Sequence, residues 1–577
     1  MTKIKEKWYR ESSPKTYTNI SIPPLKKNFF EDTHDYNSTP IGDEGSQNSI
    51  DNCRNSKTRI KISHEKIPYS FFQDNLLIDE FEKYLKASEF VDPNDRSIFK
   101  NNKGDIPVLI FEDFNTTGVT GDPFKIQEQI DGERNDFFAF WWQLYGGGKK
   151  EGKGGSVGVG RLTFAYSSQI QTFFSFSVPH NNAGKKFFLG VSVFGKYTES
   201  DNSYDSFCRF GVGDKDKFYP ITDEQRLREY HKGFKLKRDF DEPGLSMIVP
   251  FPDKEHCEIE SLKINLLERY RYSIYKDEIE IDILGETLSK KTLDTFIKKH
   301  RPKEVSKYAK YFEFIENCSQ MKNDKFNIIQ DEDNSREIRD NHLSKENIDK
   351  FTKEFSAGNI VPCKLNFEII KADHTVIDGK IKIFLQKTEN GMGSDDMMRL
   401  KMPVSGERKF GDKDVFALTL IEDPDTAEFA RLSESENHKR FDYQTLKEKN
   451  LYTKFSNPLK LLTSAAPSLH SLLLESESQK TSVDATKDFF SFGSQDPDSS
   501  GTKNKDGTGV DTKFKIPEYL FNDPKIYEIK KIKENNYTGF EIYGANVMKE
   551  TMKNIEQIKL DTVKAIAPTF GGINLED

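Results

Sequence analysis

With 577 residues, of which 31% are charged and 35% hydrophobic, the chain is too long for one hydrophobic core and too polar for a membrane protein. It has no run of 18 apolar residues, and its first residues lack the apolar stretch of a secretory signal, so we expect a cytoplasmic protein without membrane contact. The net charge of -8 gives no overall attraction to nucleic acid, although the basic stretch 290–303, typical of a solvated helix face, could contact phosphates.

The first part of the chain predicts an arm followed by an α/β domain. Residues 1–40 are polar and contain proline, which is typical of an extended arm. Residues 41–251 combine a helical pattern with apolar or alternating stretches of strand length, such as RIKISHEK, IPVLIFEDF and TFFSFSVP. Between residues 118 and 160 the chain is rich in Gly, Lys and Asp, which predicts a mobile lid.

A second α/β domain is predicted for residues 252–462, with a charged insert around residues 322–349. A helical connector should follow over residues 463–495. Residues 496–513 have a low-complexity composition that cannot bury apolar area, and this predicts a flexible linker. Residues 514–577 predict a small β-rich region that closes the chain.

The cysteines exclude two kinds of stabilising site. They are scattered, odd in number and never spaced as C-x-x-C, so neither a disulfide framework nor a zinc site is expected. We expect reduced thiols at Cys53, Cys208, Cys257, Cys318 and Cys363.

The most informative segment is EGSQNSID, residues 44–51. On a helix, Glu44 and Asn48 project from one face, with Asp51 on the same side. A carboxylate in this setting can take a proton from a water, while an amide oxygen can complete the shell of a Mg²⁺ that bridges phosphates. The alternative is a polar, exposed helix face.

A second segment, LIFEDFNTTGVTG at residues 109–121, is an apolar strand that ends in Asp113 before a sharp turn. An aspartate in this place can accept a hydrogen bond from an exocyclic amine, and a glycine lets the backbone approach a ring closely. The alternative role for Asp113 is that of a turn or capping residue.

The third segment is GGSVGVGR, residues 154–161, which runs into a helical stretch. Glycines that open a helix present backbone N–H groups and a positive dipole end to an anion. Residues 147–153 also satisfy the G-x-x-x-x-G-K pattern, but Gly154 stands where a P-loop has Ser or Thr and no apolar strand leads into it. We therefore reject a P-loop.

Together these segments resemble the GHKL superfamily (gyrase, heat-shock chaperone, histidine kinase, MutL), whose members share an E-x-x-x-N helix, a D-x-G turn and a glycine box. The nearer resemblance is to MutL-like ATPases of bacterial antiphage defence operons, through EDFNTTGVTG, GGSVGVGR and PGLSMIVPF, and more weakly over roughly residues 40–490. It implies an α/β (α+β) fold: a Bergerat-type ATPase sandwich, an S5-like transducer domain and the small β-rich C-terminal piece.

The resemblance implies roles residue by residue. Glu44 would be the general base, Asn48 the Mg²⁺ ligand and Asp113 the acceptor for the adenine amine. Gly118 would be the glycine of close approach, and Gly158 with Gly160 the phosphate loop. The remaining members of the expected nucleotide site are Asp51, Gly121, Arg161 and Lys439, the last as a transducer lysine that reaches the γ-phosphate.

Three positions depart from the family pattern or have another explanation. Asn115 replaces a usual glycine, although Asn tolerates the left-handed conformation well. Arg161 stands where Lys is common, and it offers a planar fork instead of a point charge. Lys439 lies in an H-K-R cluster, for which an exposed charged surface is the favoured explanation.

The expected function is Mg²⁺-dependent binding and slow hydrolysis of ATP, with an ATP-dependent homodimer that serves a defence or DNA-processing complex. Partner proteins from a defence operon are therefore expected, and DNA is a possible further partner. The main alternative is a nucleotide-gated scaffold or DNA clamp with little hydrolysis. A chaperone-like machine would need an exposed apolar client surface, and a histidine kinase would need a dimerising helix with a phospho-acceptor His before the pocket.

Overall fold

The computed structural model describes residues 5–12, 40–54, 57–88, 91–101, 103–130, 132–142, 160–180, 184–195, 197–199, 202–213, 217–411, 413–435, 439–490, 527–534 and 537–544. The chain divides into two compact units, Met1–Ser491 and Phe492–Asp577. In the second unit, β21 (Tyr527–Glu534) and β22 (Tyr537–Gly544) form an antiparallel hairpin. The predicted linker at residues 496–513 lies outside the described residues.

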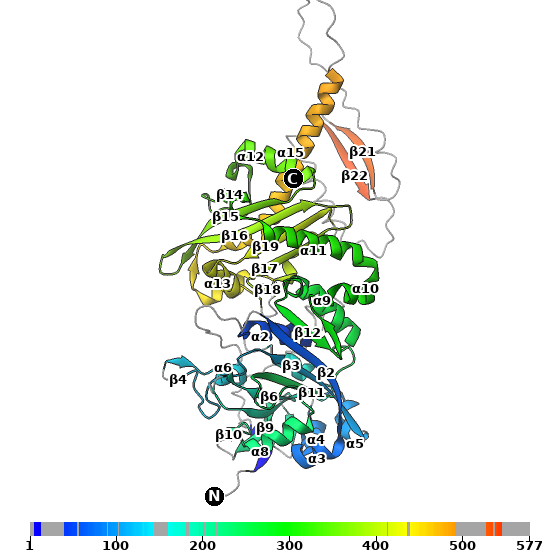
Figure 1. The fold of residues 1–577 in the computed structure, drawn as a ribbon, viewed down its shortest axis with the longest axis vertical. Coiled ribbons are helices and arrows are strands. Elements are labelled where there is room, and N and C mark those ends of the chain that lie inside the picture. Colours follow the sequence, from blue (N-terminus) through cyan, green and yellow to red (C-terminus); the bar gives the residue numbers. More distant parts are fainter. Residues whose placement is uncertain are drawn as a thin grey trace, which may run out of the picture. The chain divides into compact units, whose positions relative to one another are not determined.

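The first unit has a mixed α/β fold with two large sheets (Figure 1). The path of the first sheet is β1-β9-β7-β6-β11-β3-β2-β12-β13, and all described pairs are antiparallel except β12 with β2. Its strands are β1 (Glu6–Ser12), β2 (Thr58–Pro68), β3 (Asp105–Phe114), β6 (Thr172–Val178), β7 (Phe187–Val193), β9 (Asn202–Gly213), β11 (Gly244–Pro250), β12 (Ile279–Ile283) and β13 (Glu286–Leu288), with β8 (Tyr197–Glu199) and β10 (Phe218–Tyr219) on β9.

Both faces of this sheet are covered, which explains why β6 and β7 are apolar or small at every position and fully buried. Ile110 of β3 faces one core, and its neighbours Leu109 and Phe111 face the other. The first core is closed by α3 (Tyr69–Leu76), α4 (Ile78–Ala87), α5 (Ile98–Asn101) and α8 (Glu224–Gly233). The second is closed by α2 (Pro40–Asp51), α6 (Asp136–Trp141), α7 (Leu162–Tyr166) and α9 (Ile259–Tyr275).

The second sheet follows the path β14-β15-β16-β19-β17-β18, with β20 on β15. Its strands are β14 (Asn327–Gln330), β15 (Val361–Lys371), β16 (Val376–Lys387), β17 (Ser394–Arg399), β18 (Met402–Pro403), β19 (Val415–Ile421) and β20 (Tyr452–Thr453). The helices α10 (Leu293–His300) and α11 (Val305–Gln320) continue the core that α9 closes, and α12 (Lys345–Ser356), α13 (Pro424–Leu432), α14 (Tyr443–Lys449) and α15 (Ser456–Phe490) belong to the far side.

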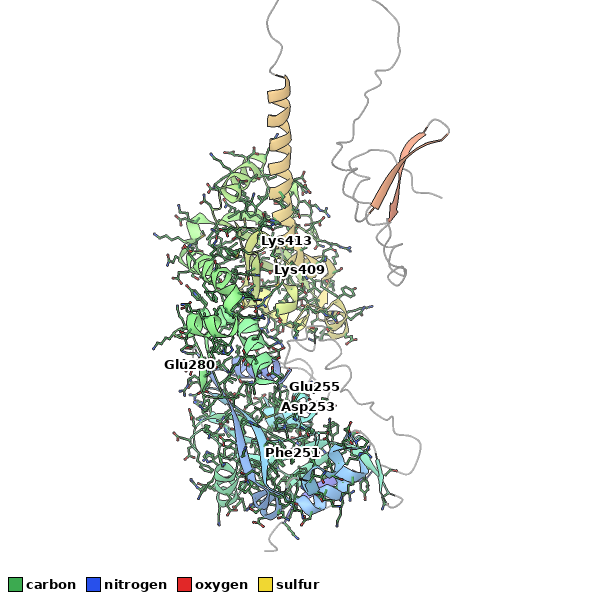
Figure 2. The ribbon with its side chains drawn as sticks, turned by 90° about the vertical axis from the view of Figure 1, so that its right-hand side faces the viewer. Phe251, Asp253, Glu255, Glu280, Lys409 and Lys413 are labelled. Carbon is green, nitrogen blue, oxygen red and sulfur yellow. The ribbon has the colours of Figure 1, made fainter. Side chains whose placement is uncertain are left out.

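The chain leaves the first sheet through a turn after β11, close to the domain boundary expected at residue 252. Phe251 donates its N–H to the carbonyl of Pro107 at 2.8 Å, and Asp253 Oδ1 accepts the N–H groups of Glu255 and His256 at 2.9 and 3.1 Å (Figure 2). The strands that follow differ from the sequence expectation. β12 and β13, predicted within the second domain, extend the first sheet.

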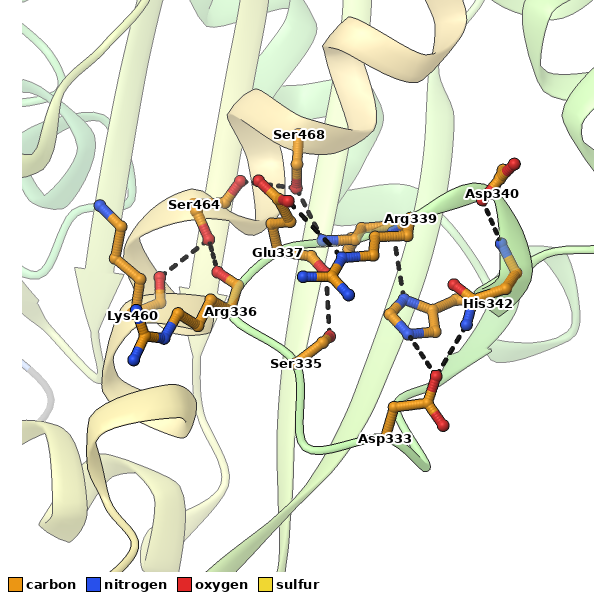
Figure 3. Close-up of polar contacts among 12 residues, drawn as sticks. Asp333, Ser335, Arg336, Glu337, Arg339, Asp340, His342, Lys460, Ser464 and Ser468 are labelled. Atoms are coloured by element: carbon orange, nitrogen blue, oxygen red, sulfur yellow. Dashed lines mark hydrogen bonds and ion pairs between the residues drawn. The ribbon is translucent and has the colours of Figure 1, made fainter. Parts of the chain in front are cut away.

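The charged insert around residues 322–349 is more ordered than its sequence suggests. It contains β14, which pairs parallel to β15, and its following segment is tied to α15 (Figure 3). Ile338 donates its N–H to Ser468 Oγ at 2.9 Å, Ser464 Oγ donates to the Arg336 carbonyl, and Arg336 Nε donates to Asn457 Oδ1 at 2.9 Å. These contacts join residues more than 120 positions apart, so no local sequence pattern predicts them.

Three expectations about bulk properties can be compared with the described residues. All five cysteines are free thiols, as predicted. Within the part of the chain that the structure describes, no helix is long and apolar enough to cross a membrane. The basic stretch 290–303 includes α10, where Lys299 and His300 contact Glu286 and Lys298 contacts Asp294, as on a solvated helix face.

Candidate functional site

Helix α2 lies against β3 because a glycine faces the sheet. A Cβ atom on Gly45 would lie 2.6 Å from the ring of Phe111, so no larger residue fits without movement. Ser49, one turn further along α2, donates its hydroxyl to Asp113 Oδ2 at 3.3 Å. The first two sequence motifs are therefore in direct contact.

Glu44 and Asn48 share one face of α2, as their spacing predicts. Asn48 Nδ2 donates to Glu44 Oε1 at 2.9 Å, and both side chains are only half-buried. Because the amide donates through its nitrogen, Asn48 Oδ1 remains an acceptor that makes no hydrogen bond with any described residue. This oxygen could ligate a cation, and Glu44 could accept a proton. The spacing prediction is confirmed, and the two roles stay predictions.

Asp113 is buried at the end of β3 and accepts three hydrogen bonds. Oδ1 accepts from the Thr116 hydroxyl and the Leu245 N–H, each at 2.7 Å, and Oδ2 accepts from Ser49. Burial raises the pKa of Asp113, and the charge of Arg238 and these hydrogen bonds lower it by less. Asp113 therefore holds the turn that follows β3, which is the alternative role given to it above. Its Oδ2 can still accept a hydrogen bond from a further donor.

Behind Asp113, two buried charged residues fix the edge of the site. Arg238 donates to the carbonyl of Asp113 and to Ser246 Oγ at 2.8 and 2.7 Å, and its Nε lies 3.6 Å from Glu112 Oε1. Glu112 also accepts the Lys237 N–H at 2.9 Å. This pair joins β3 and β11 to the loop before β11, so it holds the strand end where Asp113 lies.

The turn after Asp113 uses left-handed backbone conformations. Asn115 has φ +62°, in agreement with the expectation that Asn serves in place of glycine there. Gly118 also has φ +62°, and a Cβ on it would lie 2.3 Å from the Val178 carbonyl. Gly121 has φ +98° and is pressed against Asn135, a buried side chain that bonds the backbone of this turn. Gly118 therefore approaches β6 closely, and its expected role beside a nucleotide stays a prediction.

The third motif reaches the same helix. Gly160 lies against the Glu44 carboxylate so closely that a Cβ on it would be 1.7 Å from Oε1. Arg161 precedes α7 and is buried, with Nη2 3.4 Å from the Trp141 carbonyl, and burial together with Arg209 lowers its pKa. Gly158 and the central part of the predicted lid, residues 143–159, lie outside the described residues. The described part of that segment includes α6 and the hairpin of β4 (Gln129–Ile130) and β5 (Glu133–Arg134).

The second sheet's side of the unit also contacts α2. Lys439 Nζ lies 3.2 Å from Asp43 Oδ2, and Arg269 Nη1 of α9 lies 2.8 Å from the same oxygen. Burial, and to a smaller degree the charges of Glu44 and Asp51, raise the pKa of Tyr270, so both carboxylates are close to α9. Lys439 therefore pairs with Asp43, which directly precedes Glu44, the expected general base.

Sequence reasoning missed Asp43, Arg269, Glu112 and Arg238. Asp43 and Glu112 each stand beside a selected carboxylate, and Arg269 lies in RYRY of an otherwise ordinary helix. A charged residue at a position where the apolar pattern predicts burial is the signal that could have found Glu112 and Arg269, because such charges require partners.

The donor set limits the kind of metal that could bind. Among the described residues, no group of three or more His, Cys, Asp or Glu side chains could hold a metal ion. Asn48 alone would give a site with a single ligand from the protein. Such a site suits Mg²⁺, because this cation keeps several waters and takes its other ligands from phosphates. The residues present are compatible with that cation only together with a phosphate-bearing ligand.

Comparisons with known proteins add little. No family model matches the chain, and no curated protein matches it. Among solved structures, it is similar to the 43K ATPase domain of Thermus thermophilus gyrase B in complex with an aminocoumarin, with a TM-score of 0.22 and 9% identity. The match covers 73% of this chain and 92% of that chain. A likeness of this degree carries no assignment.

Proposed function

We propose that this chain binds ATP with Mg²⁺ and hydrolyses it slowly at the face of α2. The observation that supports this proposal is the meeting of three separate motifs: Asn48 bonded to Glu44, Ser49 bonded to Asp113, and Gly160 against Glu44. A carboxylate, a free amide oxygen, a strand-end acceptor and a glycine backbone are the groups that nucleotide hydrolysis requires in one place.

In this proposal, Glu44 takes the proton of the attacking water. Asn48 Oδ1 would hold Mg²⁺, which would supply positive charge for the phosphates. Asp113 Oδ2 accepts the adenine amine, and Gly118 and Gly121 keep the turn close. The glycine loop of Gly158 and Gly160 would supply backbone N–H groups to the phosphates. Arg161 and Asp51 support the site without touching the nucleotide. Arg161 lies beside the Trp141 carbonyl, and Asp51 is close to the buried Tyr270.

Lys439 would link nucleotide occupancy to the rest of the unit. It shares Asp43 with Arg269, so a phosphate near Glu44 that attracts the lysine would change the ion pairing at the start of α2. We propose residues 41–251 as the nucleotide-binding part and residues 252–462 as the coupling part, with β12 and β13 shared between them. ATP-dependent association of two copies would follow from such coupling.

The test is Glu44→Ala. We expect nucleotide affinity to change little while turnover falls by a factor on the order of 10² or more, as the loss of a general base does. Glu255→Ala, an exposed glutamate at the turn after β11, is the matched control and should keep full turnover (Figure 2). Equal turnover in Glu44→Ala and the wild type would remove Glu44 from this role. A wild type that binds ATP without measurable turnover would favour the nucleotide-gated scaffold.

For the biological role we propose a defence or DNA-processing complex, supported by the resemblance of EDFNTTGVTG and PGLSMIVPF to antiphage ATPases. Cells that carry the native operon should lose protection against phage when Glu44 is replaced by Ala. Unchanged plaque counts would contradict a defence role that depends on ATP hydrolysis.

A further inference from the structure

A cavity of about 490 Å³ lies in the coupling part of the unit, away from the face of α2 that carries Glu44. It is lined by α9, α11, the start of β17 and the segment before β19. Among the described residues, five cationic and two anionic side chains line it: Arg271, Lys307, Arg408, Lys409, Lys413, Glu268 and Asp395. Such an excess of positive charge is unusual in a chain with a net charge of -8.

The floor of this cavity is a buried cluster in which two arginines share one carboxylate. Asp396 Oδ2 accepts from Arg271 Nε at 2.9 Å, and Asp396 Oδ1 accepts from Arg408 Nη2 at 2.6 Å. Arg271 is buried, and Arg408 is also fixed by the carbonyl of Glu268 at 2.8 Å. Arg271 Nη1 also lies 3.8 Å from Glu268 Oε2, so the charges of the two arginines are largely paired, and the many contacts keep the floor rigid.

The rim adds lysines that have few partners. Within the described residues, neither Lys307 nor Lys413 forms an ion pair, and Lys413 Nζ lies 5.2 Å from the centre of the Phe410 ring. Lys409 Nζ lies 3.3 Å from Glu407, and Lys409 and Lys413 lie close together in the segment before β19 (Figure 2). Gly393 makes this arrangement possible, because a Cβ there would lie 2.0 Å from the Lys413 carbonyl.

We propose that this cavity binds a small phosphorylated molecule with at least two negative charges. The volume is within the range of small-molecule sites, roughly 300–1,000 Å³. Arginines fixed by hydrogen bonds and lysines at the rim are groups that recognise phosphate oxygens. In the part of the chain that the structure describes, no aromatic side chain lines the cavity, so recognition would depend on the phosphates and not on a base.

The two carboxylates of the lining favour a small ligand over a nucleic-acid backbone. Glu268 lies 3.1 Å from Arg301, and Asp395 accepts the N–H groups of Lys409 and Phe410 at 2.6 and 3.2 Å, so both are fixed in place. An extended row of phosphates would pass close to these carboxylates and be repelled. A compact ligand can place its phosphates on the cations and its hydroxyl groups on the carboxylates.

The experiment is calorimetric titration of the full chain with inorganic pyrophosphate, without added metal. We expect binding to the wild type and at least tenfold weaker binding to the double variant Lys307→Gln, Lys413→Gln. Lys303→Gln with Lys325→Gln removes the same charge from exposed positions outside the cavity, and should bind like the wild type. Melting temperatures of all three proteins check that the cavity lysines act on binding and not on folding.

Several outcomes would overturn the proposal. Absence of pyrophosphate binding by the wild type would do so, and so would equal affinity in the cavity and control variants. A duplex oligonucleotide that loses affinity in the cavity variant, while pyrophosphate does not bind, would identify a nucleic-acid surface instead. The wild type could bind pyrophosphate at both proposed sites. The event that persists in the cavity variant then belongs to the nucleotide site, and the cavity proposal requires that one event of the wild type is lost in this variant.

Discussion

At the scale of single residues, Gly160 has no room for a side chain on the side of Glu44. A Cβ there would lie 1.7 Å from Glu44 Oε1, which is the flexible end of a half-buried side chain. We expect Gly160→Ala to fold normally, because the carboxylate can move aside, and to lose most turnover, because the displaced carboxylate can no longer align a water. Circular dichroism and steady-state ATP hydrolysis would measure the two effects.

Gly104→Ala is the control for this substitution, since a Cβ at Gly104 meets no atom within 4 Å. It should change neither property. Full turnover in Gly160→Ala would show that the contact between Gly160 and Glu44 has no part in hydrolysis.

Asp113 should make stability depend on pH in the direction opposite to that of an ordinary ion-paired carboxylate. Its folded-state pKa is raised above its ordinary value of 3.8, mainly by burial, so the folded state binds its proton more tightly than the unfolded state. The contribution of Asp113 therefore decreases stability as the pH rises from about 3.8 through the folded pKa, and stays constant above it.

The variant Asp113→Asn isolates this contribution. The amide oxygen can still accept from Thr116 and Leu245, and its nitrogen can donate to Ser49. Denaturant unfolding at several pH values should show the variant gaining stability relative to the wild type as the pH rises from 4 towards neutrality. A difference that is independent of pH would mean that Asp113 titrates normally.

Nucleotide affinity should fall in the same variant, because the amide nitrogen replaces the acceptor for the adenine amine.

The residue scale also shows how far the sequence predicts the site. The four-residue spacing of Glu44 and Asn48 predicted their contact, and the left-handed conformation of Asn115 followed from its chemistry. The ion pair of Arg269 with Asp43 could not be predicted, because it joins residues far apart in the chain whose encounter depends on the tertiary fold. Local rules hold no information about such pairs.

At the scale of elements, the position of α2 depends on one contact with the sheet. In Gly45→Ala the new Cβ would lie 2.6 Å from the buried ring of Phe111. Helix propensity would favour Ala by roughly 1 kcal/mol, but overpacking in a core opposes it by about 1–3 kcal/mol. We expect a net loss of stability and of turnover, measured by chemical unfolding and ATP hydrolysis.

A double-mutant cycle with Phe111→Leu tests the cause of that loss. The smaller side chain should restore part of what Gly45→Ala removes, so the two substitutions should be less harmful together than their separate effects imply. Strictly additive effects would mean that Gly45 does not act through Phe111.

Most elements could be predicted from their patterns, whereas their assignment to sheets could not. The apolar runs at β3, β6 and β7 predicted strands, and each is a strand with mostly buried residues. The strand at β12 was predicted too, but as part of the second domain. Its alternation of apolar and polar residues fits any half-buried position, so only the pairing with β2 decides where it belongs.

At the scale of the whole first unit, the two sheets share one hydrophobic core. Leu109 and Met247 of the first sheet belong to the same cluster as Phe384 and Leu418 of the second, and α9 and α11 contribute between them. Residues 41–462 should therefore unfold in one cooperative step, although composition suggests two domains.

Tryptophan fluorescence can test this cooperativity, because all three tryptophans precede residue 252. In urea, the fluorescence transition should coincide with the transition followed by far-ultraviolet circular dichroism, which reports on helices throughout the unit. The two transitions should also coincide in Glu44→Ala, because Glu44 is half-buried and not part of the core. Two separated transitions would contradict a shared core.

The pairing of β2 with β12 also affects how the protein is made. Thr58 pairs with Ile279, so while the ribosome is still adding the residues between β3 and β12, one edge of β2 has no strand beside it. At roughly 5–20 residues per second, this interval lasts about 10–30 s. An unpaired strand edge is where nascent chains associate wrongly. Synthesis of this protein should therefore depend on ribosome-bound chaperones more than its final compactness suggests.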